Sequence, residues 1–104
     1  MPPHYIGPDA KVKNSMISEG SMVLGEVENS VIFPGVRIGK GVKVTNSVIM
    51  PSTVIRDGAV VDYAILAQNC EVAAGAKVTG ELGAITVVAE GETVLAEASG
   101  KQAG

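Results

Sequence analysis

The stretch from Glu28 to Val78 decides the fold, because it repeats one pattern three times. The three 17-residue copies are ENSVIFPGVRIGKGVKV (28–44), TNSVIMPSTVIRDGAVV (45–61) and DYAILAQNCEVAAGAKV (62–78). Each copy holds three pairs in which a small residue precedes an aliphatic one by two positions, with spacings of six, six and five residues. In the first copy these pairs are Ser30/Ile32, Val36/Ile38 and Val42/Val44. Three short strands and three corners per copy predict the triangular turn of a parallel β-helix, a hexapeptide-repeat solenoid.

The two-residue period of a strand explains the pairs. Side chains at positions i and i+2 point to the same face, which here is the interior of the triangle. The aliphatic residue fills the axis of the prism, and the small residue fits where two walls converge. A single turn cannot bury its own apolar face, so successive turns must stack. Each buried aliphatic side chain contributes about 1.5–3 kcal/mol, which offsets the entropy lost when a turn becomes ordered.

Three corner columns require backbone conformations that few residue types adopt. Glycine is favoured at positive φ because it has no Cβ, and Asn and Asp tolerate such angles. We expect a first corner column at Asp9, Gly41, Gly58, Gly75 and Gly91. A second is expected at Gly20, Gly35, Ser52 and Asn69, and a third at Asn14, Asn29, Asn46 and Tyr63. The asparagines of the third column are interpreted as a stacked amide ladder and not as a binding site.

The two ends of the chain are less regular. YIGPDAKVKNS (5–15) aligns with RIGKGVKVTNS (37–47), so the solenoid already includes the first residues, and the following turn is trimmed by two residues near Leu24–Glu26. VAEGETV (88–94) aligns with IGKGVKV (38–44), so we interpret 79–94 as a degraded last turn in which Glu92 stands where Val42 stood. The prediction is a β-helix domain of about five turns over residues 1–94 and a C-terminal tail over 95–104, frayed or forming a short helix.

The beginning of the chain carries no polar cap, although a bare solenoid end presents an open strand edge. It opens in mid-turn with Pro2-Pro3, a stiff pair that indicates a boundary to a preceding domain.

The net charge of −3 argues against nucleic acid and anionic membranes as partners. Neither a signal peptide nor an apolar run of about 18 residues is present, so a cytoplasmic location is the default. Cys70 shares its column with Val36 and Thr53, which predicts a buried structural thiol.

Catalytic chemistry of the kinds known for this fold requires residues that the chain lacks. Sugar and amino-acid acyltransferases need a general-base histidine, and metal-dependent hydratases need about three histidines around zinc. The chain contains one histidine, His4, which lies before the first recognisable turn. The glycines repeat with the corners, so they do not indicate a phosphate-binding loop. We therefore expect no catalytic, cofactor-binding or metal-binding residue in this chain.

The outward residues between the pairs predict an interaction surface. One wall presents an apolar column with two large side chains at its adjacent corner, and contiguous exposed apolar patches usually mark interfaces. The predicted interface consists of Met16, Val31, Phe33, Val48, Met50 and Ile65. The second wall presents Met22, Arg37, Val54 and Glu71, and the third presents Lys11, Lys43, Val60 and Lys77. The lysine-bearing wall could meet a phosphorylated ligand, but we favour ordinary solvated charge that blocks strand edges.

These residues also carry a family resemblance. PPHYIGPDAKVKNSMISEG (2–20), GEVENSVIFPGVRIGKGVKVTNSVIMPSTVI (25–55) and GAITVVAEGETV (83–94) together resemble the C-terminal left-handed β-helix domain of bacterial glucose-1-phosphate adenylyltransferase, ADP-glucose pyrophosphorylase. The combination VENSVIFPGV…NSVIMP is more specific to this family than the generic hexapeptide signal. The resemblance implies the left-handed sense of the helix, which the periodicity does not, and which is an exception among parallel crossovers.

The resemblance implies a function whose chemistry lies outside this segment. In that family an upstream catalytic domain uses ATP and Mg²⁺ to convert glucose 1-phosphate into ADP-glucose for glycogen biosynthesis. The β-helix contributes to the tetramer and to allosteric control, and none of the family's catalytic residues falls in the matching segment. The alternatives are the β-helix of another sugar-nucleotide pyrophosphorylase, such as a mannose-1-phosphate guanylyltransferase, or a hexapeptide-repeat acyltransferase. The sequence does not separate a catalytic subunit from a catalytically silent regulatory paralogue.

Overall fold

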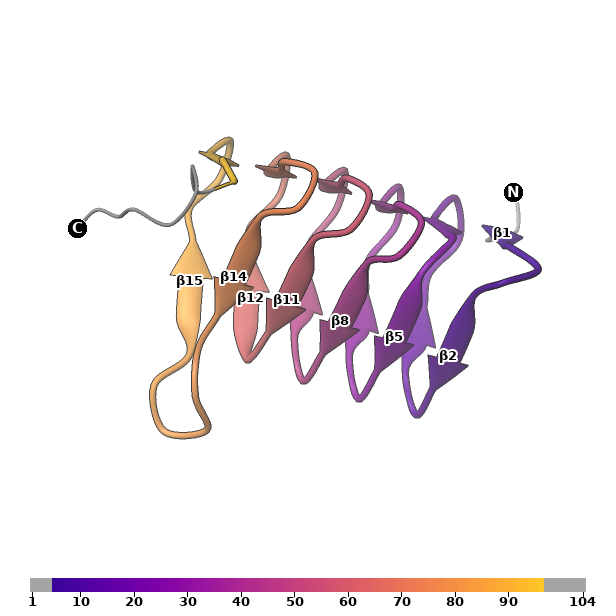
Figure 1. Cartoon of the computed structure of the whole chain (residues 1–104), viewed down its shortest axis with the longest axis horizontal. Helices are drawn as coiled ribbons and strands as arrows, with labels where there is room; N and C mark the ends of the chain where they lie inside the picture. The colour runs from indigo at the N-terminus through magenta and orange to yellow at the C-terminus, as the bar shows by residue number, and fades with distance from the viewer. Residues whose placement is uncertain (1–4, 97–104) are drawn as a thin grey trace.

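The protein is a three-sided parallel β-helix in which every third strand belongs to the same wall (Figure 1). The structure, a computed structural model, describes residues 5–96. Its three sheets, here called walls A, B and C, contain six, five and five strands, as about five turns require. All pairings between these strands are parallel, and the principal extents are 44 × 25 × 24 Å. The prediction of an all-β hexapeptide-repeat solenoid is confirmed.

The strands are short, because each wall needs only one inward pair before the next corner. Wall A contains β1 (Tyr5–Ile6), β4 (Met22–Val23), β7 (Arg37–Ile38), β10 (Val54–Ile55), β13 (Glu71–Val72) and β16 (Thr93–Val94). Wall B contains β2 (Lys11–Lys13), β5 (Glu26–Glu28), β8 (Lys43–Thr45), β11 (Val60–Asp62) and β14 (Lys77–Thr79). Wall C contains β3 (Met16–Ile17), β6 (Val31–Ile32), β9 (Val48–Ile49), β12 (Ala64–Leu66) and β15 (Thr86–Val88).

The core is the axis of the prism, filled by the predicted columns. The aliphatic members are completely or almost completely buried, among them Ile32, Ile38, Ile49, Ile55 and Leu66. The small members are buried as well, including the polar residues Ser30, Ser47 and Thr53. The inside and outside assignment of all three copies is therefore confirmed.

The buried hydroxyl groups satisfy backbone groups at the corners. Ser30 Oγ donates a hydrogen bond to the Glu28 carbonyl at 2.8 Å and accepts one from the Ser47 amide at 3.1 Å. Ser47 Oγ repeats this arrangement one turn later, where it accepts the Ala64 amide at 3.1 Å. Burial of an unpaired amide is costly, so these serines occupy their column for a hydrogen-bonding reason as well as for their size.

The asparagine column forms the predicted amide ladder. Asn14 Nδ2 donates to Asn29 Oδ1 at 2.5 Å, and Asn29 Nδ2 donates to Asn46 Oδ1 at 3.4 Å. Asn46 Nδ2 then donates at 3.3 Å to Asp62 Oδ1, which also accepts the Thr45 hydroxyl at 2.6 Å. All three asparagines have φ near +50°, as the corner requires. The ladder is thus a structural element whose amides bind one another.

One corner assignment was wrong, and one corner residue has a different conformation from the one expected. Asp9 lies in the first corner column, since the Ala10 amide donates to the Gly7 carbonyl as the Ala59 amide does to the Arg56 carbonyl, but it is not among the described residues with positive φ. Gly91 belongs to the second corner column, because its amide donates to the Gln68 carbonyl just as the Asn69 amide donates to the Pro51 carbonyl. The segment 88–94 therefore aligns with 66–72, and Glu92 follows Cys70 in its column instead of Val42. The cause is the insertion of residues 81–85 after Gly80, which shifts the register of everything that follows.

The shortened turn is confirmed, and it is shortened at one corner. Only Leu24 and Gly25 connect β4 to β5, whereas four residues, 39–42, connect β7 to β8. Glycine is required there, since a Cβ on Gly25 would lie 2.5 Å from the Val42 carbonyl oxygen.

Three predictions concern residues that lie outside the described range, namely His4, Pro2-Pro3 and tail residues 97–104.

Candidate interaction surface

The outer face of wall C carries an unbroken apolar column. Backbone pairing places Met16, Val31, Val48 and Ile65 in register, and it adds Val87 as a fifth member. The two end residues are the most exposed, with Met16 at 69% and Val87 at 66%, while the three between them are half-buried by their neighbours. We call these five residues the apolar strip. Val87 was missed from the sequence because the insertion hid its register.

Wall C differs from the other walls in its charge. None of its five strands, with the sequences MI, VI, VI, AIL and TVV, contains an acidic or basic residue. Wall A includes Arg37 and Glu71. In wall B, β2, β8 and β14 contain lysine, β5 contains glutamate and β11 contains Asp62. Charged residues are the usual means of keeping a sheet face solvated, so their absence from one wall alone sets that wall apart.

The two remaining predicted interface residues lie along one edge of this wall. The Phe33 amide donates to the Ile49 carbonyl and the Met50 amide donates to the Leu66 carbonyl, each at 2.9 Å, which places both residues directly after wall C strands. Both side chains are half-buried. The structure thus brings all six predicted residues together on wall C and its edge, and their role as an interface stays a prediction.

A projecting loop at the opposite edge of wall C, residues 80–85, is here called the arm. Six residues connect β14 to β15, whereas Tyr63 alone connects β11 to β12. Glu81 and Ala84 exchange backbone hydrogen bonds at 3.1 and 2.9 Å, and Thr86 Oγ1 donates to the Thr79 carbonyl at 2.9 Å. Figure 1 shows the arm extending beyond the line of the other corners. The poor fit of 79–85 to the repeat was the sequence signal for it.

The arm presents apolar side chains to solvent. Leu82 is 82% exposed and Ile85 is 50% exposed. Ile85 immediately precedes β15 and its Val87, so the apolar surface continues from the strip toward the arm. A single exposed leucine is ordinary on a protein surface, so the informative feature is that Leu82 and Ile85 extend the apolar surface of wall C.

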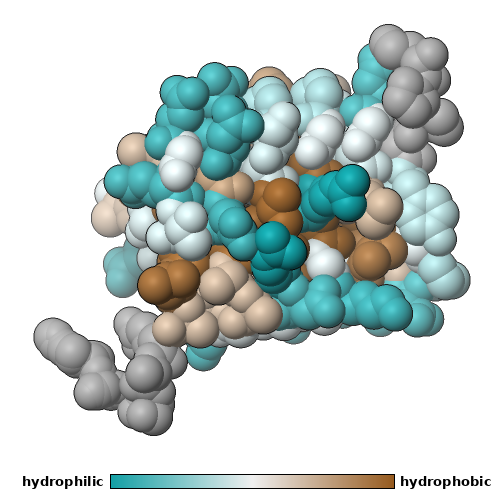
Figure 2. Space-filling view, turned by 90° about the horizontal axis from the view of Figure 1, so that it is seen from above, coloured by the Kyte–Doolittle hydropathy of each residue, from teal (hydrophilic) through white to brown (hydrophobic). Residues whose placement is uncertain are grey.

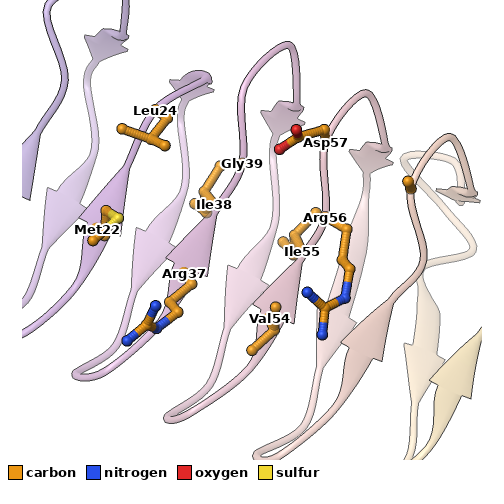
Figure 3. Close-up of a pocket in the computed structure, with 10 residues that line it drawn as sticks. Met22, Leu24, Arg37, Ile38, Gly39, Val54, Ile55, Arg56 and Asp57 are labelled. Carbon is orange, nitrogen blue, oxygen red and sulfur yellow. The ribbon is translucent and has the colours of Figure 1, made fainter.

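Wall A contains a small hollow next to a corner. Its volume is about 290 Å³, and Met22, Leu24, Arg37, Gly39 and Val54 are among its lining residues (Figure 3). Glycine at position 39 allows Asp57 to pack closely against this corner, because a Cβ there would lie against the Asp57 carboxylate and backbone. Hydrophobic and hydrophilic residues alternate over this side of the molecule (Figure 2). The nearby Arg56 is already paired, with Nε 2.6 Å from Glu71 Oε2.

Wall B is of mixed charge and is not a lysine wall. Glu26 lies between Lys11 and Lys43 in the register, and Glu28 lies beside Lys13. Glutamate between lysines on neighbouring strands partly neutralises the positive field that a phosphorylated ligand would need. Glu26 was not predicted to lie on this wall, because the shortened corner before it hid its register.

Among residues 5–96, no group of three His, Cys, Asp or Glu side chains is arranged to hold a metal ion. Cys70 is buried, as predicted, and its thiol donates to the Ala89 carbonyl at 3.0 Å. The part of the chain that the structure describes also has no helix of the length and apolarity needed to span a membrane.

Comparisons with known proteins agree with this architecture. The sequence model of the family described as "GlmU-like, C-terminal hexapeptide" matches residues 5–84. Glucose-1-phosphate adenylyltransferase of Thermotoga neapolitana is 64% identical over 44 residues, which are 42% of this chain and 10% of that protein. The enzymes of Geobacillus stearothermophilus (58% over 43 residues) and Clostridioides difficile (59% over 44 residues) match 41% and 42% of this chain, each over 11% of their own length. The chain thus matches about a tenth of the length of these relatives.

Proposed function

The chain belongs to the GlmU-like C-terminal hexapeptide family, and from this premise we propose that it is the oligomerisation and allosteric-regulatory domain of a glucose-1-phosphate adenylyltransferase. In this proposal the β-helix is not itself catalytic. A separate catalytic domain would bind ATP, Mg²⁺ and glucose 1-phosphate and form ADP-glucose for glycogen biosynthesis. The assembly would be a cytoplasmic homo-oligomer, expected to be a tetramer, and it would need neither nucleic acid nor membrane.

The apolar strip is the observation that supports the association role. It crosses all five strands of wall C without a charged residue, and both its ends are largely exposed. Removing such a contiguous apolar surface from water is favourable, at roughly 25 cal/mol per Å². Together with the exposed Leu82 and Ile85 of the arm, the strip forms a contiguous apolar surface of the kind that marks interaction sites.

The regulatory role would follow from the association. If two states of a tetramer differ in how subunits pack, a surface that holds the subunits together biases the equilibrium between these states. In the full-length enzyme that carries this segment, Val31→Glu/Val48→Glu should change the steepness of the response to an activator. An unchanged Hill coefficient in a variant that has lost its assembly would argue against the regulatory role.

Association is tested directly with the chain itself. Light scattering should give the mass of an oligomer for the unmodified chain and the mass of a monomer for Val31→Glu/Val48→Glu, because each glutamate would have to be desolvated in the contact. The matched control is Lys43→Glu/Lys77→Glu, which reverses charges on wall B and should keep the oligomer. If the glutamates on wall C leave the mass unchanged, the strip is not what holds copies together.

The non-catalytic role is tested by assay. The chain should form no ADP-glucose from ATP and glucose 1-phosphate, and it should transfer no acetyl group from acetyl-CoA to a sugar. The chain has one histidine, so His4→Ala is the matched variant for any activity that does appear. Turnover that depends on His4 would replace the proposal with an acyltransferase-type function.

A further inference from the structure

We propose that the arm is one half of a reciprocal contact between two copies of this chain. In this arrangement two wall C faces meet with their β-helix axes antiparallel, and the arm of each copy lies in a shallow hollow beside Met16 of the other. The inference rests on the proposed function, which makes the apolar strip an association surface. It adds the identity of the partner, the orientation and a second contact.

The strip alone is too small to hold a stable pair. Five strands about 4.8 Å apart give it a length of roughly 20 Å, and strands of two or three residues give it a width of roughly 10 Å. Its area is then about 200 Å², whereas a standard interface buries about 800 Å² on each partner. Further apolar contact is needed, and the arm carries Leu82, the most exposed large apolar residue of the part described.

A hollow that could receive the arm lies at the other end of the same edge of wall C. Its volume is about 480 Å³, and it is lined by Asn14, Ser15, Met16, Asn29, Ser30 and Val31. Asn14 begins the asparagine corner column, and Gly80 continues that column after Tyr63, since the Gly80 amide donates to the Asp62 carbonyl as the Tyr63 amide does to Thr45. The arm therefore begins at one end of this edge, and the hollow lies at the opposite end.

Symmetry then relates the arm to the hollow. The middle strand of wall C is β9, with two strands on either side. A two-fold axis that crosses β9 at right angles to the solenoid axis, in the plane of contact, places β15 of each copy over β3 of the other. The edge of wall C that carries the asparagine corner column then lies on the same side in both copies. Each arm therefore meets a hollow, and the contact closes as an isologous dimer. With parallel axes, the arm would instead face the edge that carries Phe33 and Met50, and both hollows would stay uncovered.

The chemistry of the two surfaces is compatible. The apolar side chains of Met16 and Val31 can pack against Leu82. The amides of Asn14 and Asn29, which also line the hollow, are already hydrogen-bonded to each other. Covering them therefore does not leave that amide pair without a partner. The backbone hydrogen bonds between Glu81 and Ala84 fix the arm before association, which lowers the entropy cost of ordering it.

The first experiment separates the arm from the strip. The mass of the full chain is measured by light scattering over a concentration series for Leu82→Asp, for Val31→Glu/Val48→Glu and for a control, Leu95→Asp. Leu95 is 72% exposed but follows β16 of wall A. We expect Leu82→Asp to weaken dimerisation at least tenfold and Leu95→Asp to leave it unchanged. If only the strip variant dissociates, the arm contact is wrong and the proposed function stands; if neither dissociates, both are wrong.

The second experiment tests the orientation by cross-linking. The variant Leu82→Cys/Met16→Cys introduces cysteines at two exposed positions. The native Cys70, in contrast, is buried, with 2% of its surface exposed. Oxidation should give a covalent dimer in which mass spectrometry finds position 82 linked to position 16 of the second copy. The antiparallel arrangement is overturned if links between identical positions predominate, or if the Leu82→Cys/Ala89→Cys variant, which reports parallel axes, cross-links faster.

Discussion

At the scale of single residues, neighbouring side chains on a strand have opposite environments. Val48 and Ile49 are consecutive on β9, yet Ile49 is fully buried on the prism axis and Val48 lies outward on wall C. The same alternation holds in every wall. Substitutions one position apart should therefore have very different consequences.

Ile49→Lys should unfold the domain, because it buries a charge without a partner halfway along the stack. The free energy of unfolding should fall by more than about 4 kcal/mol, which is exceptional for a single substitution. At concentrations low enough for the chain to be monomeric, Val48→Lys should leave the melting temperature almost unchanged. Thermal melts followed by circular dichroism distinguish the two, and equal destabilisation would mean that the inside and outside assignment is wrong.

The serine column allows a second prediction at this scale. Ser30→Ala removes the acceptor of the Ser47 amide and leaves that buried group unpaired, which costs about 1–3 kcal/mol. Ser18→Ala is the control, since Ser18 has no side-chain hydrogen bond among the described residues and is only half-buried. Urea denaturation should show a lower midpoint for Ser30→Ala alone. Similar midpoints for both variants would indicate that water replaces the lost acceptor.

At the scale of the element, the repeat predicted all three walls within residues 28–78, because side-chain alternation and corner glycines are local properties. The prediction failed beyond Val78, because the residues 81–85 interrupt the period and the motif VAEGETV fits two different columns of the solenoid. The hydrogen bond of the Gly91 amide and the pairings of Val88 with Leu66 and of Thr93 with Glu71 decide between these columns. The arm and Val87 were missed for this reason, since an insertion has no repeat partner from which its position could be read.

Two glycines in different corners give a matched pair of substitutions. Gly25→Ala should be strongly destabilising, because its Cβ would lie 2.5 Å from the Val42 carbonyl oxygen and 2.9 Å from the Val42 amide nitrogen. Gly83→Ala, in the arm, meets nothing within 4 Å and should be tolerated or slightly stabilising. Melting temperatures of both variants test this. A tolerated Gly25→Ala would show that the trimmed corner can relax.

Deletion of 81–85 should separate folding from association. Gly80 would then connect directly to Thr86, which restores the single-residue corner that Tyr63 provides one turn earlier. The core columns are untouched, so the deletion variant should melt within a few degrees of the parent at concentrations where both are monomeric. Light scattering should nevertheless show a monomer, and a deletion variant that still dimerises would contradict the role of the arm.

At the scale of the whole molecule, the distribution of charge over three walls determines how association responds to salt. Walls A and B carry the charges and wall C carries none in its strands. A contact through wall C should therefore keep its dissociation constant within about twofold between 0.05 and 1 M NaCl, because there are no ion pairs to screen. Sedimentation over this range tests it, and marked weakening by salt would point to wall B instead.

Corner length is where this chain departs from its own period: one corner is shortened at Gly25, and another is lengthened by residues 81–85. Successive turns are about 4.8 Å apart along the solenoid axis, so the corner that carries an insertion fixes the axial position of the inserted residues. Moving the five inserted residues to the corner at Tyr63 would shift the projecting leucine by one turn along the axis. A partner that binds this leucine would have to shift by the same distance. The choice of corner therefore sets the axial offset between two molecules without changing any core side chain.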